Sequence, residues 1–356
     1  MNTRRDFLKM FAASGAEAPP APDPAHESYV IRVGRRAMAC QFEICLNAGQ
    51  YPQATQAALD ALDLLEPLET QMSVFQPESE ISRINLLAGQ RPVEVEPQLF
   101  ALLELALRLH RQTQGAYDIT SGPLWEAWGF ARRAGAIPSA QRLAEARQRV
   151  GGQCVELNAE ARTIRFLRPG LQLNLGSIGK GYAVDRLAQT LQTAGIHDFL
   201  IHGGQSSMLA AGTRGSLPTP ATSNSPHWSV GIRNPAAVPG GEQRIAEIHL
   251  RDRALGTSGA QFQSFRYRGR RYGHILDPRS GEPAAGVFSA TVLAPTAALA
   301  DALSTAFYVM GPQAALAYCR EHAEIAVIML CPRGHETGWQ VHSAGLAADQ
   351  WDLLAQ

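Results

Sequence analysis

Residues 171–202 read LQLNLGSIGKGYAVDRLAQTLQTAGIHDFLIH, and this stretch carries the clearest fold signal in the chain. Alternating leucines predict a strand at 171–175, and after a glycine-rich turn the apolar spacing predicts a helix at 177–194. A second strand is predicted at 198–202, which completes a βαβ-like unit. Elsewhere helices and strands are mixed rather than regularly alternating, which favours an α+β fold over a doubly wound sheet. We therefore predict mixed or antiparallel sheets flanked by helices.

Outside this segment, alternating or apolar runs predict strands, and apolar side chains at helical spacing predict helices. The predicted strands are 29–33, 41–46, 154–157, 163–166, 207–211, 228–232, 245–250, 254–257, 287–293 and 325–330. The predicted helices are 52–72, 78–87, 97–113, 131–150, 297–310 and 312–319. The first two strands are expected to pair, and those at 154–157 and 163–166 to form a hairpin. The stretch 213–227, rich in Pro, Ser and Thr, is expected to be a flexible insertion.

The composition is that of an ordinary globular protein. Its 356 residues are 45% hydrophobic and 18% charged, and 32 basic residues balance 32 acidic ones. This neutral balance argues against a nucleic-acid partner or an anionic membrane surface. The sequence contains no apolar run of about 18 residues, so stable membrane insertion is not expected. Because single cores stop growing near about 250–300 residues, we expect residues 28–356 to form one domain with two closely joined lobes and the active site between them.

The first residues resemble an export signal. Arg4 and Arg5 precede a short apolar stretch at 10–18, a pattern similar to that of twin-arginine signals. We predict a twin-arginine-type signal at 1–18 and a Pro-rich linker at 19–27. The mature protein is then expected in the periplasm, or in the cytoplasm if the short signal is not functional.

The cysteines give no functional signal. The five residues form neither a CxxC pair nor a metal-ligand spacing. We expect buried, unpaired side chains that act as small hydrophobic groups. The five are Cys40, Cys45, Cys154, Cys319 and Cys331.

Asp301 and Thr305 lie four residues apart in the predicted helix 297–310, so they share one face. A carboxylate and a hydroxyl on an otherwise apolar surface form a hard oxygen pair of the kind that Mg²⁺ binds. In the alternative, Asp301 caps a helix or faces solvent, and Thr305 bonds a backbone carbonyl. Upstream, the run HILDPRSG at 274–281 places the titratable ring of His274 beside an acid and a turn.

The turn GSIGKG at 176–181 opens the predicted helix 177–194. It is not a P-loop, which needs four residues between the glycines and a hydroxyl after the lysine. A helix N-terminus still offers free N–H groups to a phosphate, with Lys180 one turn in, and the carbonyl of Ser177 could face a metal. Glycines that allow close packing are the alternative. Thr257 lies in a second small loop, GTSG at 256–259, of the kind that surrounds phosphates.

Two loops combine aromatic and polar residues. Asp118, in GAYDITSGPLW at 115–125, could accept hydrogen bonds from a ring amide, and a capped structural loop is the alternative. Phe75 lies between two predicted helices, where we expect an exposed ring. The sequence contains no GxSxG, HExxH or GxGxxG motif. The combined features suit a pyrophosphate-bearing ligand with an aromatic ring system.

Taken in order, these motifs resemble the FAD:protein FMN transferase family, the ApbE-like flavin transferases. The similarity extends from about Val33 to Leu330. Its landmarks are Met38 with FEI at 42–44, MSVF at 72–75, SEISRIN at 79–85, YD at 117–118, PL at 123–124, WGF at 128–130, LGSIGKGYAVD at 175–185, GG at 203–204, WSVGIR at 228–233, TSG at 257–259, HILDPRSG at 274–281 and ADALST at 300–305.

The resemblance implies roles for individual residues. The implied Mg²⁺ ligands are Asp301, Thr305 and the backbone carbonyl of Ser177. The implied FAD-binding residues are Met38, Phe75, Asp118, Lys180, Thr257 and His274. His274 would also be the base for the incoming hydroxyl, so that His274 and Asp301 are the implied catalytic residues.

The resemblance also implies the reaction. The family cuts the pyrophosphate of FAD and passes FMN to a Ser or Thr hydroxyl in the target motif of an acceptor redox flavoprotein, releasing AMP. This agrees with the residues, because phosphoryl transfer depends mostly on positioning and on neutralised charge, which Mg²⁺ and helix-terminal N–H groups provide.

Several positions depart from the family pattern. Asn174, Gln205 and Ala260 stand where acids are usual, Ala39 and Cys40 replace Gly and Thr, and Phe75 takes a position often held by Tyr. Loss of three carboxylates near a metal and a pyrophosphate leaves two alternatives open. The chain could bind or store FAD without transferring FMN, or it could act as an FAD pyrophosphatase that gives FMN and AMP.

Overall fold

The computed structural model describes residues 29–132, 135–215, 227–234, 243–259, 263–333 and 338–354. The predicted signal at 1–18, the predicted linker at 19–27, Ala260 and most of the predicted insertion at 213–227 lie outside these residues. The organisation of 28–356 as one domain with two lobes stays a prediction. Among the described residues, no helix is at once long enough and apolar enough to span a bilayer.

The centre of the fold is an eight-stranded sheet in which every neighbouring pair is antiparallel. In spatial order its strands are β1 (Val30–Ala37), β2 (Cys40–Asn47), β6 (Phe199–Gly203), β7 (Ser207–Ala211), β10 (Arg253–Gly259), β13 (Ser289–Ala294), β14 (Ala326–Pro332) and β15 (Trp339–Ala344). The expected pairing of the first two strands is confirmed. With the helices described below, the sheet confirms the α+β class.

Three smaller sheets surround the large one. The first contains β3 (Val93–Glu94), β5 (Thr163–Phe166) and β4 (Val155–Asn158), and confirms the predicted hairpin. The second contains β16 (Trp351–Leu353), β9 (Arg244–Leu250) and β8 (Trp228–Arg233). The third is the isolated hairpin of β11 (Ser264–Tyr267) and β12 (Arg270–Gly273). Strands β3, β11, β12, β15 and β16 were not predicted from the sequence.

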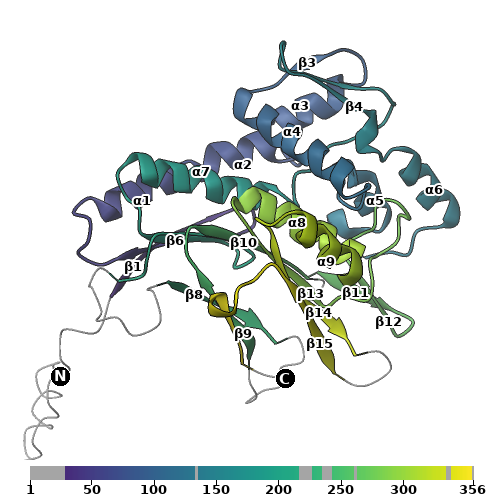
Figure 1. Cartoon of the computed structure of the whole chain (residues 1–356). Coiled ribbons are helices and arrows are strands. Elements are labelled where there is room, and N and C mark those ends of the chain that lie inside the picture. The colour runs from purple at the N-terminus through teal and green to yellow at the C-terminus, as the bar shows by residue number, and fades with distance from the viewer. Residues whose placement is uncertain are drawn as a thin grey trace, which may run out of the picture.

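The helices form two groups (Figure 1). Lying along one face of the large sheet are α1 (Ala54–Asp63), α2 (Leu65–Met72), α7 (Gly179–Thr193), α8 (Ala297–Met310) and α9 (Pro312–Glu321). Gathered with the β3–β5–β4 sheet are α3 (Glu80–Leu87), α4 (Pro97–Gln112), α5 (Gly122–Ala127) and α6 (Ala140–Gln148). The predicted helix 52–72 divides at Leu64, and the predicted helix 131–150 is confined to α6, which Ser139 caps through a bond from the Arg142 N–H.

One hydrophobic cluster joins both groups of helices to the sheet, with Phe42 and Phe199 from strands and Leu99, Leu103 and Phe307 from helices. A second cluster packs the β8–β9 strands against side chains of the large sheet. All five cysteines are free; three are buried and Cys40 and Cys154 are half-buried. This confirms that the cysteines do not pair with one another.

The predicted strand at 171–175 is wrong, and with it the βαβ unit. Leu171, Leu173 and Leu175 are buried as their alternation indicates. The backbone of Leu173, however, is bonded by a side chain: its N–H donates to Asn85 Oδ1 (2.7 Å) and its carbonyl accepts from Asn85 Nδ2 (3.0 Å). An amide from α3 therefore takes the place of a neighbouring strand. The second strand of the unit does form, but β6 is antiparallel to both of its neighbours.

Two glycines allow α8 to approach its neighbours closely. A Cβ at Gly181 of α7 would lie 2.2 Å from the carbonyl oxygen of Ala297, and one at Gly256 of β10 would lie 2.6 Å from that of Ala300. Neither gap admits a methyl group. The close-packing interpretation of the Gly181 region is thus confirmed, and α8 is fixed between α7 and the sheet.

We expect Gly181→Ala to lower the free energy of unfolding by about 1–3 kcal/mol, because the new methyl group overlaps backbone atoms of α8. A decrease in the free energy of unfolding is informative, because Ala in place of Gly ordinarily stabilises a helix by about 1 kcal/mol. Urea denaturation followed by circular dichroism measures the change. The matched control is Gly89→Ala, where the methyl group meets nothing within 4 Å and the stability should hardly change. Equal stability of the two variants would contradict the packing described.

Candidate functional site

The carboxylate of Asp301 is the buried centre of the candidate site. It lies in the first half of α8, and the residue is only 5% exposed. Its Oδ2 accepts the backbone N–H of Gly181 (2.8 Å), and the hydroxyl of Ser207 lies 2.7 Å from both carboxylate oxygens. Burial raises the pKa of Asp301 above its ordinary value, and Lys180, Ser207 and the Gly181 N–H offset only part of this effect. A buried carboxylate therefore faces one cation and has oxygen lone pairs still free.

Lys180 connects Asp301 to the other groups of the site. Its positive charge lowers the pKa of Asp301, of His274 and of the Cys40 thiol, although burial raises the pKa of Cys40 overall. Coulomb effects of this kind act over short distances. The structure thus brings Lys180, Asp301 and His274, three residues predicted from the sequence, into one electrostatic neighbourhood.

Backbone and aromatic contacts hold the ring of His274. Its Nδ1 lies 3.0 Å from the carbonyl oxygen of Gln263, and its own carbonyl accepts the indole N–H of Trp125 (2.8 Å). The two rings meet edge to face at 6.2 Å. Burial lowers the pKa of His274, and Lys180 lowers it further, while the bond to Gln263 opposes the change. A proton on Nδ1 leaves a lone pair on Nε2, so the neutral ring can accept a proton there.

Thr305 belongs to a group of hydroxyls one turn beyond Asp301. Its Oγ1 donates to the carbonyl of Asp301 (3.3 Å), as the structural alternative predicts, and lies 3.1 Å from the Ser258 Oγ. Ser258 also lies 2.8 Å from Ser304 Oγ. The neighbouring Thr257, on β10, has its hydroxyl 3.0 Å from that of Thr291. The predicted loop at 256–259 is therefore wrong, since these residues pair with β13 as the end of β10, and β10 and α8 present adjacent hydroxyl oxygens.

Tyr117 joins Ser177 to this centre. The Ser177 hydroxyl donates to the Tyr117 hydroxyl (3.3 Å), and the charge of Asp301 helps burial to raise the pKa of that phenol. Ser177 lies two residues before α7, so the start of this helix and Asp301 lie near each other. One N–H that the sequence analysis offered to a phosphate, that of Gly181, is already bonded to Asp301.

The oxygen atoms present fit a hard divalent cation. Among the described residues, no group of three or more His, Cys, Asp and Glu side chains is arranged to hold a metal. A cation at Asp301 would therefore rest on one carboxylate, with Thr305 and the Ser177 carbonyl as neutral donors. Mg²⁺ is commonly bound in this way, by one or two carboxylates with water and substrate phosphates completing its shell. The free lone pairs of the buried Asp301 carboxylate are the observation that supports this fit.

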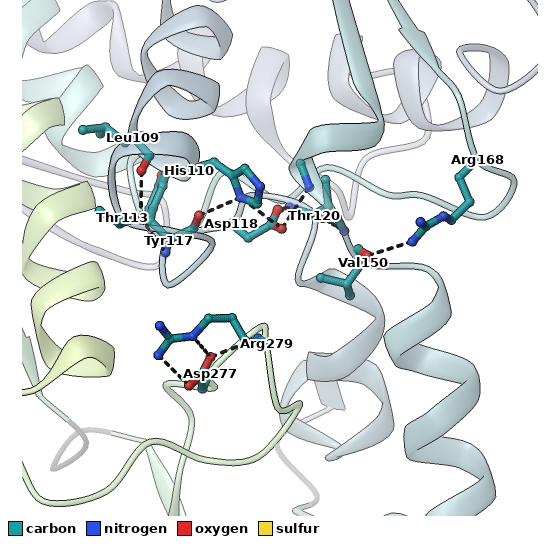
Figure 2. A network of polar contacts seen from close by, with 12 residues as sticks. Leu109, His110, Thr113, Tyr117, Asp118, Thr120, Val150, Arg168, Asp277 and Arg279 are labelled. Atoms are coloured by element: carbon teal, nitrogen blue, oxygen red, sulfur yellow. Dashed lines mark hydrogen bonds and ion pairs between the residues drawn. The ribbon is translucent and has the colours of Figure 1, made fainter.

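Neighbouring protein groups hold both carboxylate oxygens of Asp118 (Figure 2). Oδ1 accepts the N–H and the hydroxyl of Thr120 (2.8 and 2.7 Å), and Oδ2 accepts the Gly152 N–H (3.0 Å) and lies 3.3 Å from His110 Nδ1. The residue is 6% exposed. These bonds match the structural alternative, and a contact of Asp118 with FAD stays a prediction. Figure 2 also shows Arg279, whose guanidinium pairs with Asp277.

Met38 is half-buried and Phe75 is exposed. Met38 and Ala39 form the turn between β1 and β2 with positive φ angles of 49° and 59°, and the Met38 N–H donates to Glu69 (2.9 Å). Phe75, in the segment between α2 and α3, is 74% exposed, as the sequence analysis expected. An exposed ring of this size is available for stacking, but its contact with FAD stays a prediction.

Two of the three positions that lack the usual acids are described. Asn174 Oδ1 accepts the Gly176 N–H (2.9 Å), which shapes the turn before α7. Gln205 lies in the turn between β6 and β7 with a φ of 60°. Both residues therefore have backbone roles in turns.

Ser207, Tyr117 and Trp125 belong to the site but were not predicted from the sequence as members of it. Each acts through another residue: Ser207 bonds Asp301, Tyr117 bonds Ser177, and Trp125 bonds the backbone of His274. Tyr117 lies in a landmark of the family resemblance and Trp125 lies directly after one, so the resemblance was the sequence signal for these two residues. Ser207 follows the Gly-Gly turn without a motif of its own.

Comparisons with known proteins identify the family. The ApbE family model matches residues 38–329. The FAD:protein FMN transferase of Klebsiella pneumoniae (strain 342) is 33% identical over 286 residues, covering 78% of this chain and 76% of that protein. The corresponding Vibrio cholerae protein (strain O395) is 34% identical over 270 residues, covering 75% and 77%.

A solved structure gives the same result for the fold. The flavin transferase ApbE from Vibrio cholerae superposes with a TM-score of 0.76 at 29% identity, covering 89% of this chain and 98% of that one. The family model spans most of the chain, and all the site residues lie within its bounds, with Met38 at the first matched position. The chain belongs to the ApbE family.

Proposed function

We propose that this protein transfers FMN from FAD to a Ser or Thr hydroxyl of an acceptor redox flavoprotein, with Mg²⁺, and releases AMP. The similarity to proteins named FAD:protein FMN transferase supports the reaction. The observation that carries the proposal is the gathering of a buried carboxylate, Asp301, with the Lys180 ammonium and the His274 imidazole. A negative group, a positive group and a neutral base are what an attack on a pyrophosphate requires.

The reaction exchanges one phosphorus–oxygen bond for another. The acceptor oxygen bonds the phosphorus of the FMN half, the bond to the bridging oxygen breaks, and AMP leaves with that oxygen. The hydroxyl proton passes to Nε2 of His274, whose ring is neutral at pH 7 because burial and Lys180 lower its pKa. The Lys180 ammonium offsets negative charge on the phosphates.

Asp301, Thr305 and the Ser177 carbonyl would hold Mg²⁺. When bound, the ion would polarise phosphate oxygens and neutralise the charge that develops on the leaving group. The protein contributes rigidity, since α8 is confined by Gly181 and Gly256 and cannot shift the carboxylate.

We also propose that the protein acts in the periplasm, on the basis of the twin-arginine-like residues at 1–18. Export in the folded state suits an enzyme that acquires its metal and FAD before it crosses the membrane.

The direct test is incubation of the purified protein with FAD, Mg²⁺ and the flavin-accepting domain of a periplasmic redox flavoprotein, followed by intact-mass measurement of the acceptor. We expect a mass gain equal to one FMN, lost when EDTA is added or when the target hydroxyl is removed. FMN and AMP in solution with an unmodified acceptor would instead identify a pyrophosphatase. Tight FAD binding without either product would identify a binding protein.

Asp301→Asn preserves the shape and the contacts with Gly181 and Ser207 but removes the charge. We expect transfer to fall about 10²-fold or more, because a charge that stabilises the transition state through the cation is lost. The Mg²⁺ concentration for half-maximal rate should rise, and the melting temperature should not fall, since a buried charge has been removed. The control is Asp60→Asn on the exposed face of α1. Unchanged Mg²⁺ dependence in Asp301→Asn would exclude Asp301 from the metal site.

The pH dependence of transfer should report His274. The ring must be neutral to accept a proton, so the rate should rise with pH through the pKa of His274 and level off above it. Burial and Lys180 place that pKa below the ordinary 6.5, so we expect the acid limb below pH 6.5. In Lys180→Met the limb should move to higher pH, because a repelling charge is gone. An acid limb that does not move would show that another group limits the rate.

A further inference from the structure

The β11–β12 hairpin concentrates positive charge that the rest of the chain balances. Four arginines lie within six residues, and residues 263–273 contain no acid. All four are exposed. They are Arg266, Arg268, Arg270 and Arg271. Because the whole chain is neutral, a basic surface this dense is a local feature that the overall composition conceals.

Aromatic packing fixes the base of this hairpin. Phe265 and Tyr272, which are cross-strand partners, stack at 5.3 Å, and they contact Phe130 and Trp128 at 5.6 and 5.7 Å. In Figure 1 the hairpin lies at the right-hand side of the molecule, below α5 and α6. The base is thus held by a packed cluster, while the arginines project from the exposed part.

Three of the four arginines do not serve the fold through ion pairs. Within the described residues, Arg266, Arg268 and Arg270 form no ion pair with an acid. Arg268 and Arg270 lie over the rings of Tyr267 and Tyr272, at 5.4 and 5.2 Å. By register, Arg266 stands opposite Arg271, and like charges in directly opposed positions destabilise a strand pair. Arg271 also donates to Ser264 Oγ (2.8 Å), so Arg266, Arg268 and Arg270 are the three that we consider for an anionic partner.

The hairpin is connected directly to the proposed base. His274 follows the last residue of β12, and the carbonyl of Gln263, next to β11, accepts the His274 N–H (3.1 Å) and faces its Nδ1 (3.0 Å). Arg270 lies four positions before His274, a span of about 13 Å in extended chain. A chain segment that binds the arginines therefore has its neighbouring residues within reach of His274.

We propose that the β11–β12 hairpin docks an acidic segment of the acceptor protein, beside the hydroxyl that receives FMN. This inference rests on the proposed transferase function, and it names the chemistry of the partner. Guanidinium groups bind carboxylates through paired N–H bonds, and a basic surface beside an active site accelerates encounter with an acidic partner. A protein segment is favoured over a lipid surface because the hairpin lies where the hydroxyl must arrive.

The test compares two triple variants with the same loss of charge. R266Q/R268Q/R270Q removes three of the four hairpin charges. The control R32Q/R91Q/R165Q removes three exposed arginines that lie in β1, in the segment after α3 and in β5. At low salt, kcat/KM for the acceptor should fall about tenfold or more in the hairpin variant alone. The value of kcat and the affinity for FAD should be unchanged. High salt should reduce the wild-type rate toward that of the hairpin variant, because screening removes the attraction.

A binding measurement keeps this inference separate from the transferase itself. The probe is a fluorescein-labelled peptide of alternating Asp and Ser, with Asn replacing Asp in its control, followed by anisotropy. We expect only the acidic peptide to bind, and only the hairpin variant to lose it. Absence of FMN transfer by the wild-type protein would refute the proposed function, whereas this binding would still stand.

Three outcomes would overturn the docking role. Equal kcat/KM in the two triple variants would show that the arginines do not meet the acceptor. Weaker FAD binding by the hairpin variant would assign them to the FAD phosphates. Wild-type protein that floats with vesicles of equal parts phosphatidylglycerol and phosphatidylcholine, with transfer unaffected by the substitutions, would assign the hairpin to a membrane surface.

Discussion

The buried carboxylate of Asp301 is the constraint on which the rest of the site depends. A carboxylate out of contact with water is costly unless its oxygens are hydrogen-bonded. Here Gly181 of α7 and Ser207 of β7 supply the donors, so one side chain links a helix start, a strand and α8. The bond to Gly181 requires α7 and α8 to lie nearly in backbone contact, which the missing Cβ of that glycine allows. The bond between Gly181 and Asp301 thus both joins α7 to α8 and positions the carboxylate of the candidate site.

Helices α7 and α8 each provide a carboxylate that accepts backbone N–H groups from the start of the other helix. Asp301 of α8 accepts the N–H of Gly181 near the start of α7, and Asp185 of α7 accepts the N–H groups of Ala297 and Ala298 at the start of α8 (2.7 and 2.9 Å). Each helix therefore satisfies unpaired N–H groups of the other. Burial raises the pKa of Asp185 to about 7, and the charge of Asp301 adds to the effect. The two carboxylates therefore lie close enough for the charge of one to affect the ionisation of the other.

Features that depend only on residues nearby in the sequence were predicted correctly. The helix at 297–310 was predicted with its observed bounds, and the Asp301–Thr305 pair followed from the four-residue spacing on that helix. The strand at 171–175 failed because Asn85, 88 residues from Leu173, supplies the backbone bonds that a strand would have supplied. Ser207 was missed for the same reason: its role arises only from the contact of β7 with α8. The β11–β12 hairpin escaped prediction because arginines mask the alternation of Phe265 and Tyr267.

Lys180 resolves a conflict that burial creates in this site. Burial alone would favour the neutral forms of both Asp301 and His274, raising the pKa of the acid and lowering that of the ring. The reaction that we propose requires the acid charged and the ring neutral. One ammonium within range of both groups favours the ionised carboxylate and disfavours the protonated imidazole, so both effects act in the required direction. A single lysine in the first turn of α7 thereby separates the ionisation of an acid from that of a base at the same pH.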